Sequence, residues 1–500
     1  MKSIFNNLFV LDLANNHFGN VAHGIKIIND YGKIIRKQKV KATVKFQFRN
    51  LDTFIHPDFL NSDEKYVKRF MSTKLSENDF KKLFDNVKKN KLLTSCTPFD
   101  EDSVGLIEKM KFDIIKIASV SSTDFNLLER VTKNKIPKII STGGKSLTDI
   151  DKIVSFFRKK KQHFALMHCI AIYPSKNEHL QISFIKELKD RYKDIEIGWS
   201  THESPKEHLP ACLAYACGAR IFEKHIGIDS RKHGLNNYSI TPKLFEEWLN
   251  YLMQSISILG SQNKKIIKKE LDTLNALKRG VYAKKNIKKG KILNKNDFYF
   301  PFPLQKGQLS SNELKKLTSI KKNFNTNSII KKSDVNFDKD LLTEYRIRSY
   351  IHELKAILSY NKIQIGENFD MEISHHKGIE NFRETGCFLF NIINKSYAKK
   401  MLVMLPNQKH PLHFHKRKEE SFHVISGSLI SNLNGKKKTL NPGQILHIGK
   451  NSWHEFKAGN EGCIFDEIST TSYTDDSFYK DKKIKKLTRD FRKTFISKWI

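Results

Sequence analysis

Eight short apolar runs, each followed by a segment with helical spacing, fill residues 1–260 of the chain. They read, in order, LFVLDLA, ATVKFQF, KLLTSCTP, IIKIAS, KIIST, FALMHCIA, IEIGWST and ARIFEKHI. Strands that are apolar along their whole length are typical of parallel sheets covered on both faces. Eight such units in this length predict a closed, TIM-type (β/α)8 barrel of the α/β class. No GxGxxG motif follows the first run, which argues against a dinucleotide-binding sheet.

The rest of the chain changes its pattern several times. From about Gly386 short strands alternate with turns, as in CFLFNII, KKMLVML and NPGQILHIG, and this is typical of an antiparallel all-β barrel. The predicted organisation beyond the first barrel is a charged linker at 261–278, a compact basic module at 279–335, a helical connector at 336–385, a β-barrel domain at 386–475 and a basic tail at 476–500.

The chain is strongly basic, with 89 Lys and Arg against 53 Asp and Glu, a formal charge of +36. The lysines come as scattered short runs, for example at 159–161 and 436–438, without an aromatic-interleaved stripe. We interpret them as solvated surface and expect no nucleic-acid partner, although a general positive field would attract anionic metabolites. The N-terminal segment is too polar for a signal peptide, no apolar run of about 18 residues occurs, and the cysteines form no CxxC motif. These features predict a cytoplasmic protein with reduced thiols and no membrane partner.

Polar side chains stand out at the ends of the predicted barrel strands. The carboxyl-terminal ends of barrel strands meet at one rim, where such enzymes place their chemistry. The candidate rim residues are Asp12, Lys45, Thr97, Lys116, Ser119, Tyr173, Ser200, His202, Glu223 and His225.

Two histidines end neighbouring predicted strands of this rim. His202 and His225 would lie about 5 Å apart, close enough to share one divalent ion and leave positions open for substrate. Lys45 and Lys116, with nearby hydroxyl groups, supply the donors that a phosphate and a carboxylate require. The rim therefore predicts a metal-assisted reaction of an anionic substrate.

Eight motifs carry a resemblance to a known family: NNHFG, VKFQ, CTPFD, IKIAS, STGG, HCxxxYP, WSTHE and EKHIG. In this order and spacing the chain resembles the N-acetylneuraminate (sialic acid) synthases over about residues 5–335. The segment RGVYAKKNIKKGKIL looks like their antifreeze-protein-like (SAF) domain, which has a β-clip fold. The resemblance implies condensation of phosphoenolpyruvate with the aldehyde of an N-acylhexosamine, assisted by Mn or Mg, with release of phosphate. It also implies a homodimer in which the SAF domain reaches the partner's barrel.

The resemblance implies roles for the rim residues. His202 and His225 would bind the metal, and Asp12 stands where the family has a glutamate that acts on water. Substrate would be held by Lys45, Thr97, Lys116, Ser119, Tyr173, Ser200 and Glu223, and the catalytic set would be Asp12, Lys45, Lys116, His202 and His225.

The chain departs from the family on the side that binds the sugar. Where the family has a glutamate and an asparagine, this chain has Ser121 and Ala171. Where the family has an aspartate and an arginine, this chain has Asn236 and Phe302. The phosphoenolpyruvate side is kept, so we expect an active enzyme with a different amino-sugar-type aldose as its acceptor.

A second cluster of metal-ligand residues lies in the C-terminal β-domain. His413, His415 and Glu420 follow the spacing H-x-H-x(4)-E-x(6)-G, and His454 follows a later turn. This pattern resembles the cupins, and three imidazoles with one carboxylate suit Mn, Fe, Ni or Zn. His410 and His423 are expected to be bystanders.

Two other functions remain open from the sequence. The segment KKMLVMLPNQKHPLHFHKRKEESFHV resembles the sugar-isomerase-like cupins, so the chain could be a sugar isomerase or epimerase with the barrel as an accessory. The net charge leaves a non-enzymatic, polyanion-binding scaffold as a third reading.

Overall fold

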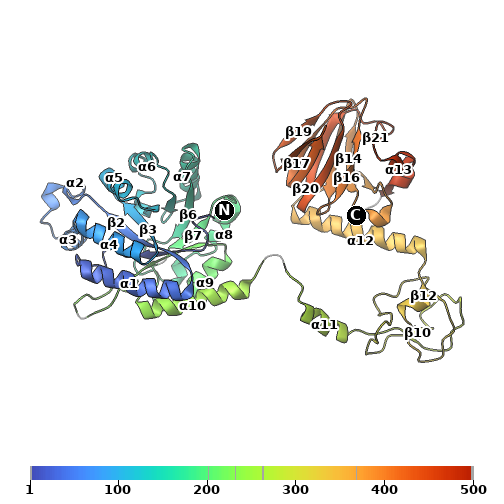
Figure 1. Ribbon diagram of the computed structural model, residues 1–500, viewed down its shortest axis with the longest axis horizontal. Coiled ribbons are helices and arrows are strands. Elements are labelled where there is room, and N and C mark those ends of the chain that lie inside the picture. Colours follow the sequence, from blue (N-terminus) through green and yellow to red (C-terminus); the bar gives the residue numbers. More distant parts are fainter. Residues whose placement is uncertain (1–2, 201, 231, 262–263, 367–368, 497–500) are drawn as a thin grey trace. The chain divides into compact units, whose positions relative to one another are not determined.

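The computed structural model describes residues 3–200, 202–230, 232–261, 264–366 and 369–496. These fall into two compact units, residues 1–264 and 265–500, which we describe separately (Figure 1). The described residues include no helix long and apolar enough to cross a membrane.

The first unit is a closed barrel of parallel strands, as predicted. Its strands are joined in sequence order, with β1 pairing β8 to close the ring. They are β1 (Leu8–Asp12), β2 (Lys41–Phe48), β3 (Leu93–Pro98), β4 (Ile114–Ile117), β5 (Lys138–Ser141), β6 (Phe164–Cys169), β7 (Ile197–Ser200) and β8 (Ile221–His225). Nearly every strand residue is buried, which accounts for the continuous apolar runs in the sequence.

Helices follow the strands and cover the outside of the barrel (Figure 1). The longer ones are α1 (Val21–Gln38), α4 (Glu77–Lys89), α5 (Glu101–Met110), α7 (Leu147–Lys159) and α10 (Pro242–Leu259). The shorter ones are α2 (Leu51–Phe54), α3 (Lys65–Ser72), α6 (Phe125–Val131), α8 (Phe184–Arg191) and α9 (Leu209–Ala216). Side-chain caps begin several of them, including Asn20, Ser76, Asp100 and Ser146, each of which accepts a backbone N–H of the first turn. Apolar residues of these helices pack on the outer face of the strands to form the main core.

A small irregular β module follows in the second unit. After α11 (Lys268–Ala276) it contains β9 (Tyr282–Ala283), β10 (Phe298–Tyr299), β11 (Ser319–Ile320) and β12 (Val335–Asn336). Its own small core includes Val281, Ile287, Leu309 and Ile330. α11 lies in the predicted linker, of which residues 262 and 263 are outside the described part. The identity of this module as an SAF domain remains a prediction.

The remainder of the second unit is an antiparallel β structure, in agreement with the predicted cupin barrel. Its sheet runs in the order β18-β17-β20-β15-β14-β13-β22, with β16, β19 and β21 pairing at its sides. The strands are β13 (Asp370–Ser374), β14 (Cys387–Asn394), β15 (Tyr397–Met404), β16 (Lys409–Phe414), β17 (Glu420–Leu433), β18 (Lys436–Leu440), β19 (Ile445–Ile448), β20 (His454–Thr470), β21 (Phe478–Tyr479) and β22 (Lys493–Ile496).

This sheet extends beyond the predicted limits of 386–475. β13 lies in the segment predicted to be a helical connector. The main helix of that connector is α12 (Lys339–Tyr360). Residues 367 and 368 of the connector are outside the described part. The predicted basic tail folds onto the same domain, because β21 pairs with β16 and β22 pairs with β13. This C-terminal segment also contains α13 (Lys482–Lys485) and α14 (Arg489–Arg492). Residues 497–500 are outside the described part. The C-terminal segment is therefore part of the β-domain up to Ile496.

Candidate active site and metal centre

The register of the barrel strands brings polar residues of β1, β2 and β8 side by side. Asp12, the last residue of β1, lies opposite Lys45 on one side and His225 on the other. Ser200 of β7 lies opposite Glu223 of β8. Because strand side chains alternate between faces, Glu223 and His225 project to the same side of the sheet, into the barrel.

A buried network of ion pairs joins these residues. Nζ of Lys45 lies 2.9 Å from Oδ2 of Asp12 and 2.9 Å from Oε1 of Glu223. Nζ of Lys116 lies 3.0 and 2.9 Å from the two oxygens of Glu223. The hydroxyl of Ser200 donates to Glu223 over 3.1 Å. Buried charges require partners of this kind, and here one carboxylate holds two ammonium groups at the rim.

The same contacts set the protonation states. Burial would raise the pKa of Glu223, but Lys116 and Lys45 hold that pKa well below its ordinary value. Burial would lower the pKa of Lys45, but Asp12 and Glu223 raise it above the ordinary value of a lysine. Glu223 is therefore a carboxylate and Lys45 an ammonium group at neutral pH.

His202 and His225 form a pair beside this network. Their ring centroids are 5.4 Å apart. Nδ1 of His202 lies 2.9 Å from the carbonyl of Ile170, which can only accept, so Nδ1 carries the proton and Nε2 keeps its lone pair. Burial, and then His225, lower the pKa of His202 to about 3, and burial lowers that of His225. Two neutral imidazoles thus lie side by side, and Oδ2 of Asp12 is 3.3 Å from Nε2 of His225.

The other predicted rim residues also lie at this end of the barrel. Thr97 is the residue before the last in β3, and its buried hydroxyl has no hydrogen-bond partner among the described residues. The hydroxyl of Ser119, after β4, accepts the backbone N–H of Gly143 over 3.0 Å. The ring of Tyr173 lies 4.1 Å from that of His202, centroid to centroid.

Tyr238 was missed by the sequence interpretation. Its ring lies 5.1 Å from that of His225, 5.3 Å from Tyr173 and 6.1 Å from His202, measured between centroids. It stands in the long segment after β8, outside any strand, so periodicity gave no signal for it. Asn236, two residues before Tyr238, accepts the backbone N–H of Ser239 over 2.9 Å and shapes this segment.

The residues predicted to stand in place of the family's sugar contacts differ in their exposure. Ser121 is buried after β4, and Ala171 is exposed after β6. Phe302 belongs to the second unit and is 59% exposed.

The predicted cupin ligands come together in the β-domain. One ligand atom from each of His413, His415, Glu420 and His454 lies within 4.8 Å of the others, and all four residues are buried. Among the described residues this is the one group of three or more such side chains that could hold a metal ion. β16 supplies His413, β17 supplies Glu420 and β20 supplies His454.

Backbone carbonyls orient the three imidazoles of this cluster. Nδ1 of His413 donates to the carbonyl of Pro411 and Nδ1 of His454 to that of Ser452, each over 2.9 Å. Nδ1 of His415 donates to the carbonyl of Asp476. Because a carbonyl only accepts, every Nδ1 carries a proton, and Nε2 is left as the nitrogen that could bind a metal. Nε2 of His454 lies 2.9 Å from Oε1 of Glu420, and Nε2 of His415 lies 3.7 Å from Oε2. The donor set and its tautomers thus fit a divalent cation.

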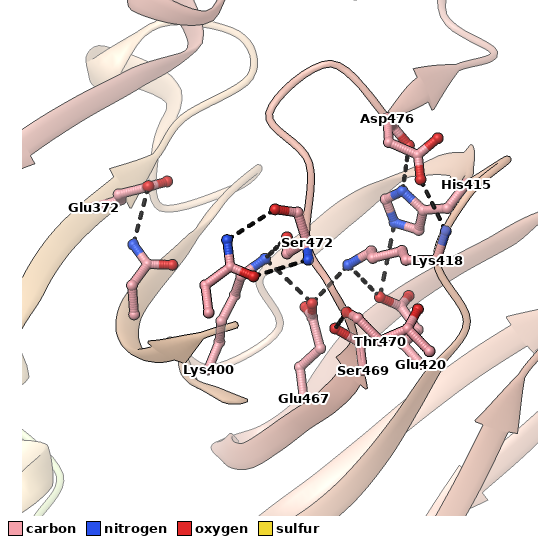
Figure 2. Close-up of polar contacts among 12 residues, drawn as sticks. Glu372, Lys400, His415, Lys418, Glu420, Glu467, Ser469, Thr470, Ser472 and Asp476 are labelled. Carbon is pink, nitrogen blue, oxygen red and sulfur yellow. Dashed lines mark hydrogen bonds and ion pairs between the residues drawn. The ribbon is translucent and has the colours of Figure 1, made fainter. Parts of the chain in front are cut away.

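Asp476 also organises the loop between the ligands. Its buried carboxylate accepts the backbone N–H groups of Lys416, Arg417 and Lys418 over 2.9 to 3.1 Å. Figure 2 shows Asp476 beside His415 and Lys418. This support comes from the segment predicted to be a tail, so the sequence interpretation did not identify it.

Comparisons with known proteins agree with this arrangement. The NeuB family model matches residues 36–264, and the cupin domain model matches residues 400–465. A protein of Methanocaldococcus jannaschii is 31% identical over 293 residues, which are 58% of this chain and 82% of that protein. The chain belongs to the NeuB family.

Named relatives of this NeuB chain include synthases of acidic sugars. The N,N'-diacetyllegionaminic acid synthase of Campylobacter jejuni is 29% identical over 240 residues, covering 47% of this chain and 71% of that enzyme. A crystal structure of a spore coat polysaccharide biosynthesis protein E from Chromobacterium violaceum is 39% identical, with a TM-score of 0.64, over 66% of this chain and all of that one. The prediction of a sialic acid synthase-like enzyme with an added cupin domain is therefore confirmed.

Proposed function

We propose that the barrel condenses phosphoenolpyruvate with an amino-sugar-type aldose, such as an N-acylhexosamine, to give a nonulosonic acid. The supporting observation is the pair Lys45 and Lys116, both buried and both held by Glu223 at the rim. A substrate with a phosphate and a carboxylate needs two fixed cations of this kind. The named synthases among the relatives support the same reaction class.

The reaction balances with water as the third reactant. C3 of phosphoenolpyruvate attacks the aldehyde carbon, a carbon–carbon bond forms, and the aldehyde oxygen takes a proton. Water adds at C2, the bond from C2 to the phosphate oxygen breaks, and a 2-keto acid and inorganic phosphate leave. The lysines neutralise the anionic substrate, and the hydroxyls of Thr97, Ser119 and Ser200 fix its orientation.

Asp12 has two functions in this proposal. Its Oδ2 lies 2.9 Å from Lys45 and 3.3 Å from His225, so it orients both groups. The same oxygen is the proposed acceptor for the proton of the attacking water. A Mn²⁺ or Mg²⁺ ion bound by His202 and His225 would polarise the aldehyde oxygen.

The acceptor aldose is proposed to differ from N-acetylmannosamine. Ser121, Ala171 and Asn236 are smaller or uncharged where the family has sugar-binding groups. We also propose a homodimer in which residues 279–335 of one chain cover the barrel of the other, which would bring Phe302 toward the partner's acceptor site.

The cupin domain is proposed to hold a second divalent metal, Mn, Fe, Ni or Zn, on His413, His415, Glu420 and His454. The enclosed cluster also supports the alternative function, a sugar isomerase or epimerase on the cupin with the barrel as its accessory.

Phosphate release tests the main proposal. Purified protein with Mn²⁺ and phosphoenolpyruvate is mixed with a panel of N-acylhexosamines and simple aldoses. The proposal expects aldose-dependent release of phosphate with at least one of them. Isomerisation of an aldose without phosphate release would instead support the alternative.

A further inference from the structure

A polar cavity lies inside the cupin domain, beside the proposed metal cluster. Its volume is about 280 Å³, and its walls include His413, His415 and Glu420. The segment after β20 contributes further wall residues, among them Tyr479, Arg492 and Lys493. Ligand pockets usually measure about 300–1,000 Å³, so this cavity suits a small, monosaccharide-sized ligand.

A chain of buried charges extends from the metal cluster along this cavity. Nζ of Lys418 lies 2.6 Å from Oε2 of Glu420 and 2.6 Å from Oε1 of Glu467. Nζ of Lys400 lies 3.3 Å from the same oxygen of Glu467 and donates to the hydroxyl of Ser472 over 2.8 Å. Figure 2 shows Glu467 between the two lysines. Two cations and two carboxylates balance one another here.

A second group of charges on the wall is not balanced in this way. Glu372 of β13 receives both Arg489, at 2.8 Å, and Lys493. Arg492 also lines the cavity, with its guanidinium carbon 5.0 Å from the centre of the Tyr479 ring. Within the described part of the chain, Arg492 forms no ion pair with a carboxylate. This group therefore carries three cations against one buried carboxylate.

The cavity as a whole holds an excess of positive charge. Five cationic side chains line it, against four acidic ones, of which Asp370 is exposed. A divalent ion on the ligand cluster would add two more positive charges. Arg489 and Lys493 are partly exposed, at 36% and 22% of their side-chain surface, so an anion that enters from solvent can reach this excess positive charge. Arginine and lysine together recognise carboxylate and phosphate groups.

We propose that the cupin cavity binds a small polyhydroxylated anion, a sugar acid or a sugar phosphate. Its anionic group would lie against Arg489, Arg492 and Lys493, and its hydroxyls would face the metal cluster and the Lys418–Glu467–Lys400 chain. This assignment rests on the metal proposed for the cupin, and it goes beyond the synthase reaction of the barrel. The same basic side chains can bind either a carboxylate or a phosphate group. The titration described next distinguishes the two kinds of ligand.

Calorimetric titration of the full chain tests this assignment. Lys116→Met in the barrel serves as the background, because it is expected to weaken binding of sugar acids at the proposed barrel site. The Mn²⁺-loaded protein is titrated with gluconate, glucuronate and N-acetylneuraminate as carboxylates. Glucose 6-phosphate and N-acetylmannosamine 6-phosphate serve as phosphates, and glucose and N-acetylmannosamine as neutral controls. At least one anion is expected to bind at least tenfold more tightly than its neutral counterpart.

Two variants then locate the binding. Arg492→Gln and Lys493→Met are each expected to weaken the anion at least tenfold, whereas the exposed Lys482→Met changes nothing. Metal content, measured on the same samples, is expected to stay the same in all variants, which separates loss of the ligand from loss of the metal or the fold. Absence of binding by every anion, equal binding of the neutral sugars, or no effect of either variant would overturn the assignment. Failure of the unsubstituted cupin to hold any metal would instead contradict the metal proposal.

Discussion

Nζ of Lys116 lies 3.0 and 2.9 Å from the two carboxylate oxygens of Glu223, within a fully buried pair. The lysine is thus fixed before any substrate arrives, and an anionic substrate meets a preorganised cation. Lys116→Met should therefore lower the rate of phosphate release about 100- to 1,000-fold, the effect expected for loss of one preorganised charge.

The matched control for this change is Lys138→Met. Lys138 begins β5, is also buried, and lies 2.6 Å from Gln162 and 2.8 Å from the carbonyl of Asn134, outside the rim network. It should change phosphate release less than about threefold, after thermal unfolding has shown that both variants fold. Equal losses in the two variants would contradict a specific function of Lys116.

The two proposed metal centres should be separable. His413→Ala with His415→Ala should remove the cupin metal and leave phosphate release from phosphoenolpyruvate unchanged within about twofold. His202→Ala with His225→Ala should leave the cupin metal in place and abolish phosphate release, because the aldehyde would no longer be polarised. Metal content by mass spectrometry and phosphate release are measured on the same samples. Survival of phosphate release in the barrel variant would contradict the proposed function of His202 and His225.

Asp476 should support metal binding without touching the metal. Its carboxylate accepts three backbone N–H groups of the loop between His415 and Glu420. Asp476→Ala should weaken the cupin affinity for Zn²⁺ about 10- to 100-fold, as for other residues that orient metal ligands. Asp475→Ala is the control, because its side chain is exposed and pairs with Arg417. An unchanged affinity for Zn²⁺ in Asp476→Ala would show that the loop holds its shape without this residue.

The small β module should lose stability in acid, and part of this loss should come from Asp297. Burial would raise the pKa of this carboxyl, but Lys291, at 2.6 Å, and the backbone N–H of Asn294 lower it to about 2. A carboxyl with a lowered pKa stabilises the fold fully above its unfolded pKa, near 4, and loses that contribution as pH falls toward 2.

Asp297→Asn should therefore reduce stability to urea by a constant amount above about pH 5, and the difference from the unsubstituted protein should shrink between about pH 4 and 2. The exposed Asp272→Asn should show no such change. A difference that is independent of pH down to 2 would contradict the assigned pKa.

Much of the barrel could be predicted because each strand is a local pattern. The run ATVKFQF at residues 42–48 corresponds to β2, Lys41–Phe48, and the rim position of Lys45 follows from that strand and from ring closure. The cupin ligands were equally accessible, since three of them lie within eight residues, from the end of β16 to the first residue of β17.

The contacts that depend on long-range register could not be predicted. Lys400 and Glu467 face each other only because β15 pairs with β20 in one particular register. Glu372 meets Lys493 only because the C-terminal segment returns to pair with β13. A run of lysines and arginines near the end of a chain resembles a solvated tail, and nothing local distinguishes it from an edge strand that closes a cavity.

The most direct test of the central claim is aldose-dependent release of inorganic phosphate from phosphoenolpyruvate, with the product identified by mass spectrometry. The account predicts that Mn²⁺-loaded protein and at least one N-acylhexosamine give phosphate and a sugar acid larger than the aldose by three carbons in equal amounts, and that Lys116→Met does not. Phosphate release from no aldose in the panel, or release without a carbon–carbon bonded product, would contradict it.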